Sequence, residues 1–206
     1  MKALLLLSGG IDSPVAGRML QESGVELEAL HASFEPITDD ASVEKAKELA
    51  ACLGLRRLHV VKIGEALAKI PQDRDAHRFY FVLQKRLLYR LADAAADALG
   101  CDVVATGENL GQVSSQTLDN LTTLEAAARR PVIRPLLGLD KVEIIAAAKE
   151  WDTYEVSLGP ELCDLLGPNK PATVSDKEVV ATFEERLGLT TDLPGFETYE
   201  LPLAAQ

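Results

Sequence analysis

Apolar and polar positions along the chain fall into blocks that predict strands followed by helices. Residues 3–7 form a short, continuous apolar run, which is typical of a strand buried on both faces of a parallel sheet. Further strands are predicted at residues 25–32, 58–63, 102–106 and 132–134. Repeated strand–helix–strand units with right-handed crossovers predict an α/β fold, a doubly wound parallel five-stranded sheet.

The segments between these strands have helical spacing. The longest predicted helix covers residues 75–99, where an apolar residue recurs at every fourth position and marks one buried face. Other helices are predicted at about residues 12–22, 39–53, 114–128, 140–150 and 176–187. We expect residues 154–173 to form a loop and the tail after the last helix to be irregular. Residues 1–174 are expected to form one domain, to which the helix and tail of residues 175–206 also belong.

Composition narrows the class of protein. The chain has 206 residues, enough for one well-packed domain, and its hydrophobic and charged fractions of 47% and 26% are those of an ordinary globular protein. A net charge of -11 argues against unaided nucleic-acid binding, which usually needs a basic face. Three scattered cysteines suit a reducing cytoplasm, and no apolar run is long enough to span a membrane.

The sequence SGGIDS at residues 8–13 lies between the first predicted strand and the first predicted helix. The two glycines allow the backbone to approach a phosphate closely, and the amide groups at the helix start attract the anion. Ser8 and Ser13 carry hydroxyl groups that can donate hydrogen bonds. Asp12 can orient the loop or help to hold Mg²⁺, which prefers hard oxygen ligands. This segment is the candidate phosphate-binding loop.

Other nucleotide-binding loops are absent from the sequence, which contains neither GxxxxGK[ST] nor GxGxxG. The segment at residues 8–13 instead resembles the SGGxDS signature of the PP-loop ATP pyrophosphatases. This resemblance implies an adenine nucleotide alpha-hydrolase-like fold, which is Rossmann-like and of the HUP type. It also implies an activity, the cleavage of ATP to AMP and pyrophosphate with adenylation of a substrate oxygen. ATP and Mg²⁺ are the implied cofactors.

Further segments resemble one family within that superfamily, the ThiI tRNA 4-thiouridine sulfurtransferases. They are SGGIDSPVA at residues 8–16, ATGENLGQVSSQT at residues 105–117, RPLLGLDK at residues 134–141 and TYE at residues 153–155. They occur in the family's order, and the second is the most specific. The resemblance runs from residue 1 to about residue 173.

The resemblance implies a set of nucleotide contacts. The implied ATP-binding residues are Leu6, Leu7, Ser8, Gly9, Gly10, Asp12, Ser13, His31, Ala32, Arg86, Gly107 and Gln116. Leu6 and Leu7 are expected to contact the ligand through their backbone only, and the backbone at His31 and Ala32 is expected to read adenine. Asp12 and Cys163 are the candidate catalytic residues.

Cys163 is a candidate because the family's sulfur chemistry needs a cysteine that attacks or relays a persulfide. It is the only cysteine after residue 155, whereas Cys52 and Cys101 are expected to be packed. Because the sequence starts at the first strand of the catalytic domain, we expect a stand-alone domain without the family's THUMP or rhodanese domains. tRNA is therefore expected to be held by a separate RNA-binding protein or by a homodimer of this chain, with a separate sulfur-donor protein.

Two other functions stay open at this point. The same ATP chemistry can serve a small-molecule acceptor with ammonia or sulfide as the nucleophile, which the acidic charge favours. A non-catalytic ATP-binding module is the second alternative, although a complete SGGxDS loop argues against it.

Overall fold

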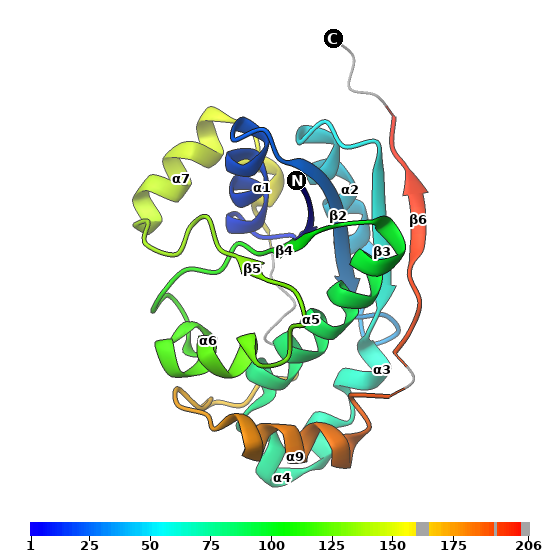
Figure 1. Cartoon of the computed structure of the whole chain (residues 1–206), viewed down its shortest axis with the longest axis vertical. Coiled ribbons are helices and arrows are strands. Elements are labelled where there is room, and N and C mark those ends of the chain that lie inside the picture. The colour runs from blue at the N-terminus through cyan, green and yellow to red at the C-terminus, as the bar shows by residue number, and fades with distance from the viewer. Residues whose placement is uncertain (160–164, 192, 203–206) are drawn as a thin grey trace.

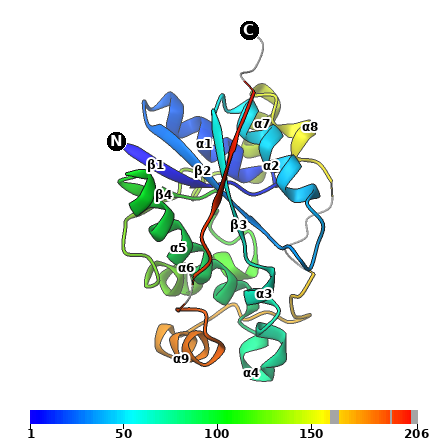
Figure 2. The same cartoon turned by 90° about the vertical axis from the view of Figure 1, so that its right-hand side faces the viewer.

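The computed structural model describes residues 1–159, 165–191 and 193–202, which form a six-stranded sheet between two layers of helices (Figures 1 and 2). The strands are β1 (Lys2–Leu6), β2 (Glu26–Ser33), β3 (Arg57–Lys62), β4 (Val103–Ala105), β5 (Val132–Ile133) and β6 (Glu197–Glu200). Their order across the sheet is β5-β4-β1-β2-β3-β6. The five strands from β1 to β5 pair in parallel, as predicted for a doubly wound sheet.

The sixth strand corrects both the predicted strand number and the predicted irregular tail. β6 pairs antiparallel with β3, so that His59 faces Thr198 across the two strands. Three of its four residues are exposed, because it forms an edge of the sheet. An exposed edge strand carries no apolar alternation, which is why the hydrophobic pattern did not reveal it.

The helices follow the predicted order with changes at their ends. They are α1 (Asp12–Glu22), α2 (Ala41–Cys52), α3 (Gly64–Leu67), α4 (Arg74–His77), α5 (Tyr80–Leu99), α6 (Leu118–Glu125), α7 (Lys141–Glu150), α8 (Tyr154–Ser157) and α9 (Lys177–Leu187). The helix predicted at 75–99 is divided between α4 and α5, and the one predicted at 114–128 starts as a 3-10 turn at Ser114–Gln116. The expected loop at 154–173 contains the short helix α8.

The sheet separates two hydrophobic cores, because successive residues of a strand point to opposite faces. Leu4 and Leu30 pack with α5 on one face. Leu5 and Ala29 pack on the other face with residues of α1, α2 and α7. In the described parts of the chain, none of the helices combines the length and apolar character needed to cross a bilayer.

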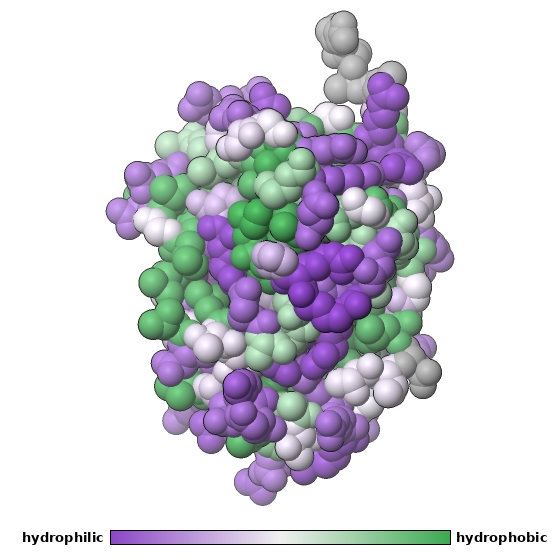
Figure 3. Space-filling view, viewed as in Figure 1, coloured by the Kyte–Doolittle hydropathy of each residue, from purple (hydrophilic) through white to green (hydrophobic). Residues whose placement is uncertain are grey.

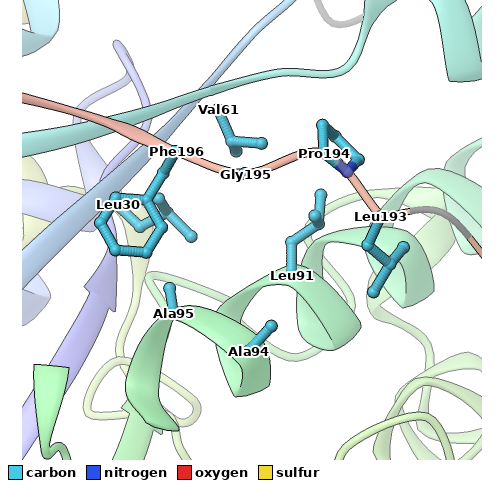
Figure 4. A pocket seen from close by; sticks show the side chains of 9 residues that line it. All are labelled: Leu30, Val61, Leu91, Ala94, Ala95, Leu193, Pro194, Gly195 and Phe196. Carbon is cyan, nitrogen blue, oxygen red and sulfur yellow. The ribbon is translucent and has the colours of Figure 1, made fainter. Parts of the chain in front are cut away.

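An apolar cavity of about 200 Å³ lies between the sheet and α5, beneath the segment that leads into β6 (Figure 4). Leu30 and Val61 line it from the sheet, Leu91 from α5 and Phe196 from the covering segment. The C-terminal segment therefore also closes one side of the core.

The strand order changes direction at β1. From β1 the chain proceeds to β2 and β3 on one side, and it returns to β4 and β5 on the other. The loops after β1 and β4 therefore leave neighbouring strands at the same edge of the sheet. In doubly wound folds this switch point is where ligands bind.

Candidate nucleotide-binding site

The loop from Ser8 to Ser13 is folded by its own two hydroxyl groups. The Ser8 N–H donates to Ser13 Oγ at 2.8 Å, and the two hydroxyl oxygens lie 3.0 Å apart. The Gly10 N–H donates to Ser8 Oγ at 3.3 Å. Among the described residues, the N–H groups of Gly9 and Ile11 have no acceptor. The loop therefore presents unused amide donors at the start of α1, an arrangement that suits a phosphate.

Asp12 at the start of α1 is held by two side chains from other loops. Its Oδ1 accepts from Lys141 Nζ at 2.5 Å. With its amide nitrogen turned toward Asp12, Gln112 donates to Oδ2 at 3.2 Å and accepts from Lys141 at 2.8 Å. Lys141 is the first residue of α7, whose start is fixed by the Asp140 N–H donating to Glu143 at 2.7 Å. The ammonium group of Lys141, at the start of α7, is thus brought to the SGGIDS loop.

Gly107 lies directly against the start of α1. A Cβ atom at this position would be 2.6 Å from the backbone nitrogen of Ser13 and 2.7 Å from the carbonyl carbon of Asp12. These are backbone atoms that cannot move aside, so any side chain here would force the two loops apart. The structure therefore brings Gly107 and the SGGIDS loop together, as the predicted switch-point arrangement requires.

The ends of β1 and β2 are joined by a buried histidine. The Leu7 N–H donates to the Leu30 carbonyl at 2.9 Å, and His31 Nδ1 lies 2.9 Å from the Leu7 carbonyl oxygen. Burial lowers the pKa of His31 more than this hydrogen bond raises it, which favours the neutral ring. Leu6 and Ala32 are half-buried on the adjacent strands. The expected adenine-contacting backbone is therefore fixed next to the loop.

The sequence did not identify a buried charged cluster just after Gly107. Glu108 is 5% exposed and accepts hydrogen bonds from Lys85 at 2.9 Å, Tyr89 at 2.5 Å and Arg134 at 3.0 Å. Burial alone raises the pKa of Glu108, but Lys85, Tyr89 and Arg134 outweigh it and lower the pKa to about 2. The sequence offered one signal, that Glu108 lies in the family-like segment at residues 105–117 and Arg134 in the one at residues 134–141.

Arg86 and Gln116 differ in their hydrogen bonding: the Arg86 guanidinium has partners in the protein, and the Gln116 side-chain oxygen has none among the described residues. The Arg86 guanidinium is 2% exposed and donates to Glu184 at 2.9 and 2.6 Å and to the Thr123 carbonyl at 2.5 Å. These bonds tie α5 to α9 and α6, so an ATP contact of Arg86 stays a prediction. Gln116 is buried, and its Oε1 has no hydrogen-bond partner among the described residues. An unpaired buried oxygen of this kind is consistent with a ligand contact.

The cysteines differ from expectation in one case. Cys101 is buried as expected, but Cys52 at the end of α2 is exposed rather than packed. Cys163 lies outside the described residues. Across residues 1–159, 165–191 and 193–202, no three His, Cys, Asp or Glu side chains are grouped so that they could hold a metal ion.

The edge of the sheet around the loop carries apolar side chains. Leu110, Val113 and Leu137 are each more than a third exposed, and the Leu110 N–H donates to the Leu137 carbonyl at 3.1 Å. Hydrophobic residues gather along the left side of the face in Figure 3, where Figure 1 has the loops after β4 and β5. The cavity of Figure 4 includes no residue of the SGGIDS loop.

A mostly parallel sheet with the SGGIDS loop at its switch point and a glycine packed against that loop is the fold of the PP-loop, adenine nucleotide alpha-hydrolase class. Within this class the chain belongs to the ThiI family, because the model of the family described as "Thiamine biosynthesis protein (ThiI)" matches residues 1–189.

Two relatives illustrate the similarity. A "Probable tRNA sulfurtransferase" of Brevibacillus brevis is 39% identical over 90% of this chain and 48% of its own length. One from Thermotoga maritima is 39% identical over 95% of this chain and 52% of its own length. The chain thus spans about half the length of the curated relatives it matches.

Solved structures agree with the fold. A 4-thiouridine synthetase solved as a complex with RNA and bound ATP has a TM-score of 0.85 and 36% identity, over 97% of this chain and 55% of that chain. An NMN synthetase from Francisella tularensis has a TM-score of 0.57 at 19% identity, over 89% of this chain and 76% of that one. The second match supports the fold alone.

Proposed function

We propose that this chain binds ATP at residues 8–13, cleaves it between the α and β phosphates and transfers AMP to the C4 carbonyl oxygen of a uridine in tRNA, which sulfur then replaces. The observation that carries the proposal is the close approach of Gly107 to the amide of Ser13, beside a loop with unused N–H donors. Membership of the ThiI family and the ATP and RNA bound by the related synthetase support it.

In this proposal the phosphates and the nucleoside of ATP bind different residues at the edge of the sheet where β1 and β4 end. The phosphates lie on the amide groups of Gly9 and Gly10 and the hydroxyl groups of Ser8 and Ser13. The nucleoside lies along the backbone of Leu6, Leu7, His31 and Ala32, with Gly107 and Gln116 beside it. Arg86 remains a proposed contact from α5. The amide donors stabilise the negative charge that develops on pyrophosphate as it leaves.

Asp12 is the residue proposed to hold Mg²⁺. A single carboxylate together with phosphate oxygens and water is a common coordination set for this ion. Lys141 is already within hydrogen-bond distance of Asp12, so the carboxylate is held in place before a ligand binds. Mg²⁺ would supply charge neutralisation on the phosphates.

The sulfur step is proposed for Cys163. Burial raises the pKa of the Cys101 thiol, and partial burial together with Glu48 and Asp152 raises that of Cys52, which disfavours the reactive thiolate form at both positions. A sulfur-donor protein would transfer a sulfur atom to Cys163 as a persulfide, and the terminal sulfur would form a bond to C4 of the uridine as AMP leaves with the former carbonyl oxygen. An external thiol would then cleave the S–S bond, which releases the thiouridine and leaves Cys163 in a disulfide with that thiol. tRNA would be held by a separate RNA-binding protein or by a homodimer, in the cytoplasm.

The test is the product formed from ATP. The chain is incubated with α-labelled ATP and Mg²⁺, with and without unmodified tRNA, and AMP is separated from ADP. We expect AMP, and more of it when tRNA is present. AMP at a rate unaffected by tRNA favours a small-molecule acceptor, which the net charge of -11 also favours. ADP as the product would contradict the PP-loop assignment.

The matched variant is Asp12→Ala. Because Asp12 is proposed to act on the phosphates, we expect AMP formation to fall by at least about 100-fold, a loss typical of removing a charge-stabilising group. The fold should persist, since Asp12 is half-buried and outside the core. Asp119→Ala, at an exposed position on α6, is the control and should retain full activity. Full activity in Asp12→Ala would refute the assignment.

A further inference from the structure

Lys45 on α2 covers the outer side of the phosphate loop. The point where a Cβ atom would lie on Gly9 is 3.2 Å from Lys45 Cδ and 3.7 Å from Cε. The methylene stem of the lysine therefore packs on the first glycine of the loop. The ammonium group lies one bond beyond Cε, at the end of a stem that reaches across the loop.

A chain of hydrogen bonds sets this position. His31 Nδ1 is 2.9 Å from the Leu7 carbonyl oxygen, and its Nε2 is 3.3 Å from Ser42 Oγ. The first turn of α2 is thereby linked to the end of β1, where the phosphate loop starts. Lys45 lies three residues after Ser42 and thus on the same side of the helix.

Lys45 has a neutral hydrogen-bond acceptor among the described residues. Its ammonium donates to the carbonyl oxygen of Ser157 at 2.8 Å. In the parts of the chain that the structure describes, no carboxylate forms an ion pair with it, whereas Lys47 on the same helix pairs with Glu44 at 2.7 Å. An ammonium has three donors and one neutral acceptor occupies only one of them, so Lys45 can bind an anion on the loop.

We propose that Lys45 is a further phosphate-binding residue of this site, which contacts the β and γ phosphates of ATP. This proposal rests on the proposed function. As the substrate oxygen forms its bond to the α phosphorus, the bond from that phosphorus to the bridging oxygen breaks, and the electron pair leaves with pyrophosphate. Lys45 on one side of the loop stabilises that charge, and Lys141 is the cation on the other side.

The test is the affinity for three ligands, ATP, inorganic pyrophosphate and AMP, measured by calorimetry with Mg²⁺ on the full chain. Lys45→Met keeps the stem that packs on Gly9 and removes the charge. We expect ATP and pyrophosphate to bind about 10- to 100-fold more weakly, as for the loss of a charge-assisted hydrogen bond, with AMP affinity changed less than about twofold. Lys45→Arg should restore most of the affinity.

Lys47→Met is the matched control, since it lies on the same helix and already pairs with Glu44. It should bind all three ligands like the unaltered chain. If Lys45→Met weakened AMP as much as pyrophosphate, or left all three affinities unchanged, the role of Lys45 in phosphate binding would be overturned. If the unaltered chain bound neither ATP nor pyrophosphate, the proposed function itself would fail, and the inference with it.

Discussion

At the scale of single residues, one buried carboxylate organises the loop that Gly107 belongs to. Glu108 connects α5, through Lys85 and Tyr89, to the residue after β5, Arg134. Without its partners, so buried a charge would be strongly destabilising. With them it fixes the loop after β4 against the start of α1, and so positions one side of the proposed nucleotide site.

Glu108 should contribute pH-dependent stability. Its folded pKa of about 2 lies below the usual 4.5, so the contribution is complete above the unfolded pKa and is lost as the pH falls toward 2. The shift corresponds to roughly 3 kcal/mol at pH 7, of which about 1 kcal/mol is lost by pH 3.5. We expect Glu108→Gln to destabilise the chain strongly at pH 7 and less at pH 3.5.

Urea unfolding of the unaltered chain and of Glu108→Gln at both pH values measures this difference. Glu150→Gln is a control in which an exposed carboxylate at the end of α7 is removed, and it should show little change between the two pH values. An equal destabilisation by Glu108→Gln at pH 7 and pH 3.5 would contradict the assigned charge state of Glu108.

The sequence points to those candidate site residues that lie together in a motif. The loop at 8–13 and Gly107 could be predicted because each requires a particular residue type at a fixed place in a strand–loop–helix unit. Lys45 and the pairing of Lys141 with Asp12 could not, because each joins segments that are distant in sequence. A lysine on a predicted helix face has no local feature that separates a phosphate contact from a solvated charge.

At the scale of elements, a buried ion pair joins α9 to α5. Glu184 of α9 is fully buried and binds Arg86 of α5 through two hydrogen bonds, while Arg90 donates to the same carboxylate at 2.9 Å. Figure 1 shows α9 at the end of α5 that lies away from α7. The existence of α9 could be predicted from its periodicity, but its position depends on this ion pair and on the packing of Val180 and Phe183 against the core.

Removing the Glu184 carboxylate should therefore lower the free energy of unfolding. In Glu184→Ala the Arg86 guanidinium stays buried without its counter-charge, and breaking a buried ion pair in this way typically costs about 3–5 kcal/mol. Glu185→Ala, at the exposed neighbouring position, should change the free energy of unfolding by less than about 0.5 kcal/mol. Chemical denaturation of both variants gives the comparison, and a loss below about 1 kcal/mol in Glu184→Ala would contradict this role of the ion pair.

The edge strand shows a different limit of prediction. β1 to β5 could be predicted because their residues alternate between two buried faces or form apolar runs. β6 has mainly exposed side chains, and it is fixed by backbone pairing to β3 and by the hydrogen bond between His59 and Thr198 at 2.9 Å. Such pairing depends on the sheet already being formed, so nothing local in residues 197–200 specifies it.

At the scale of the whole molecule, the charge of the chain leaves few basic side chains available to bind an RNA backbone. Acidic residues outnumber basic ones by 32 to 21. Several of the basic residues are committed to carboxylates, including Lys85, Arg86, Arg134 and Lys141 at or near the site. A phosphate backbone is gripped by cations that release its counterions, and such paired cations are poorly available for this.

We therefore expect this 206-residue chain to bind tRNA with a shallow dependence on salt. If only two or three phosphates are contacted, the affinity should fall by less than about 100-fold between 50 and 200 mM salt, whereas six to ten contacts would give about 1,000-fold or more. Titration of fluorescent tRNA at several salt concentrations measures the slope, with a tRNA-sized DNA duplex as the control for non-specific binding. A shallow slope supports delivery of tRNA by a separate RNA-binding protein or domain, because the catalytic domain then contacts little beyond the nucleotide it modifies. A steep slope would mean that a basic surface exists despite the acidic composition, and that the domain itself grips the tRNA backbone.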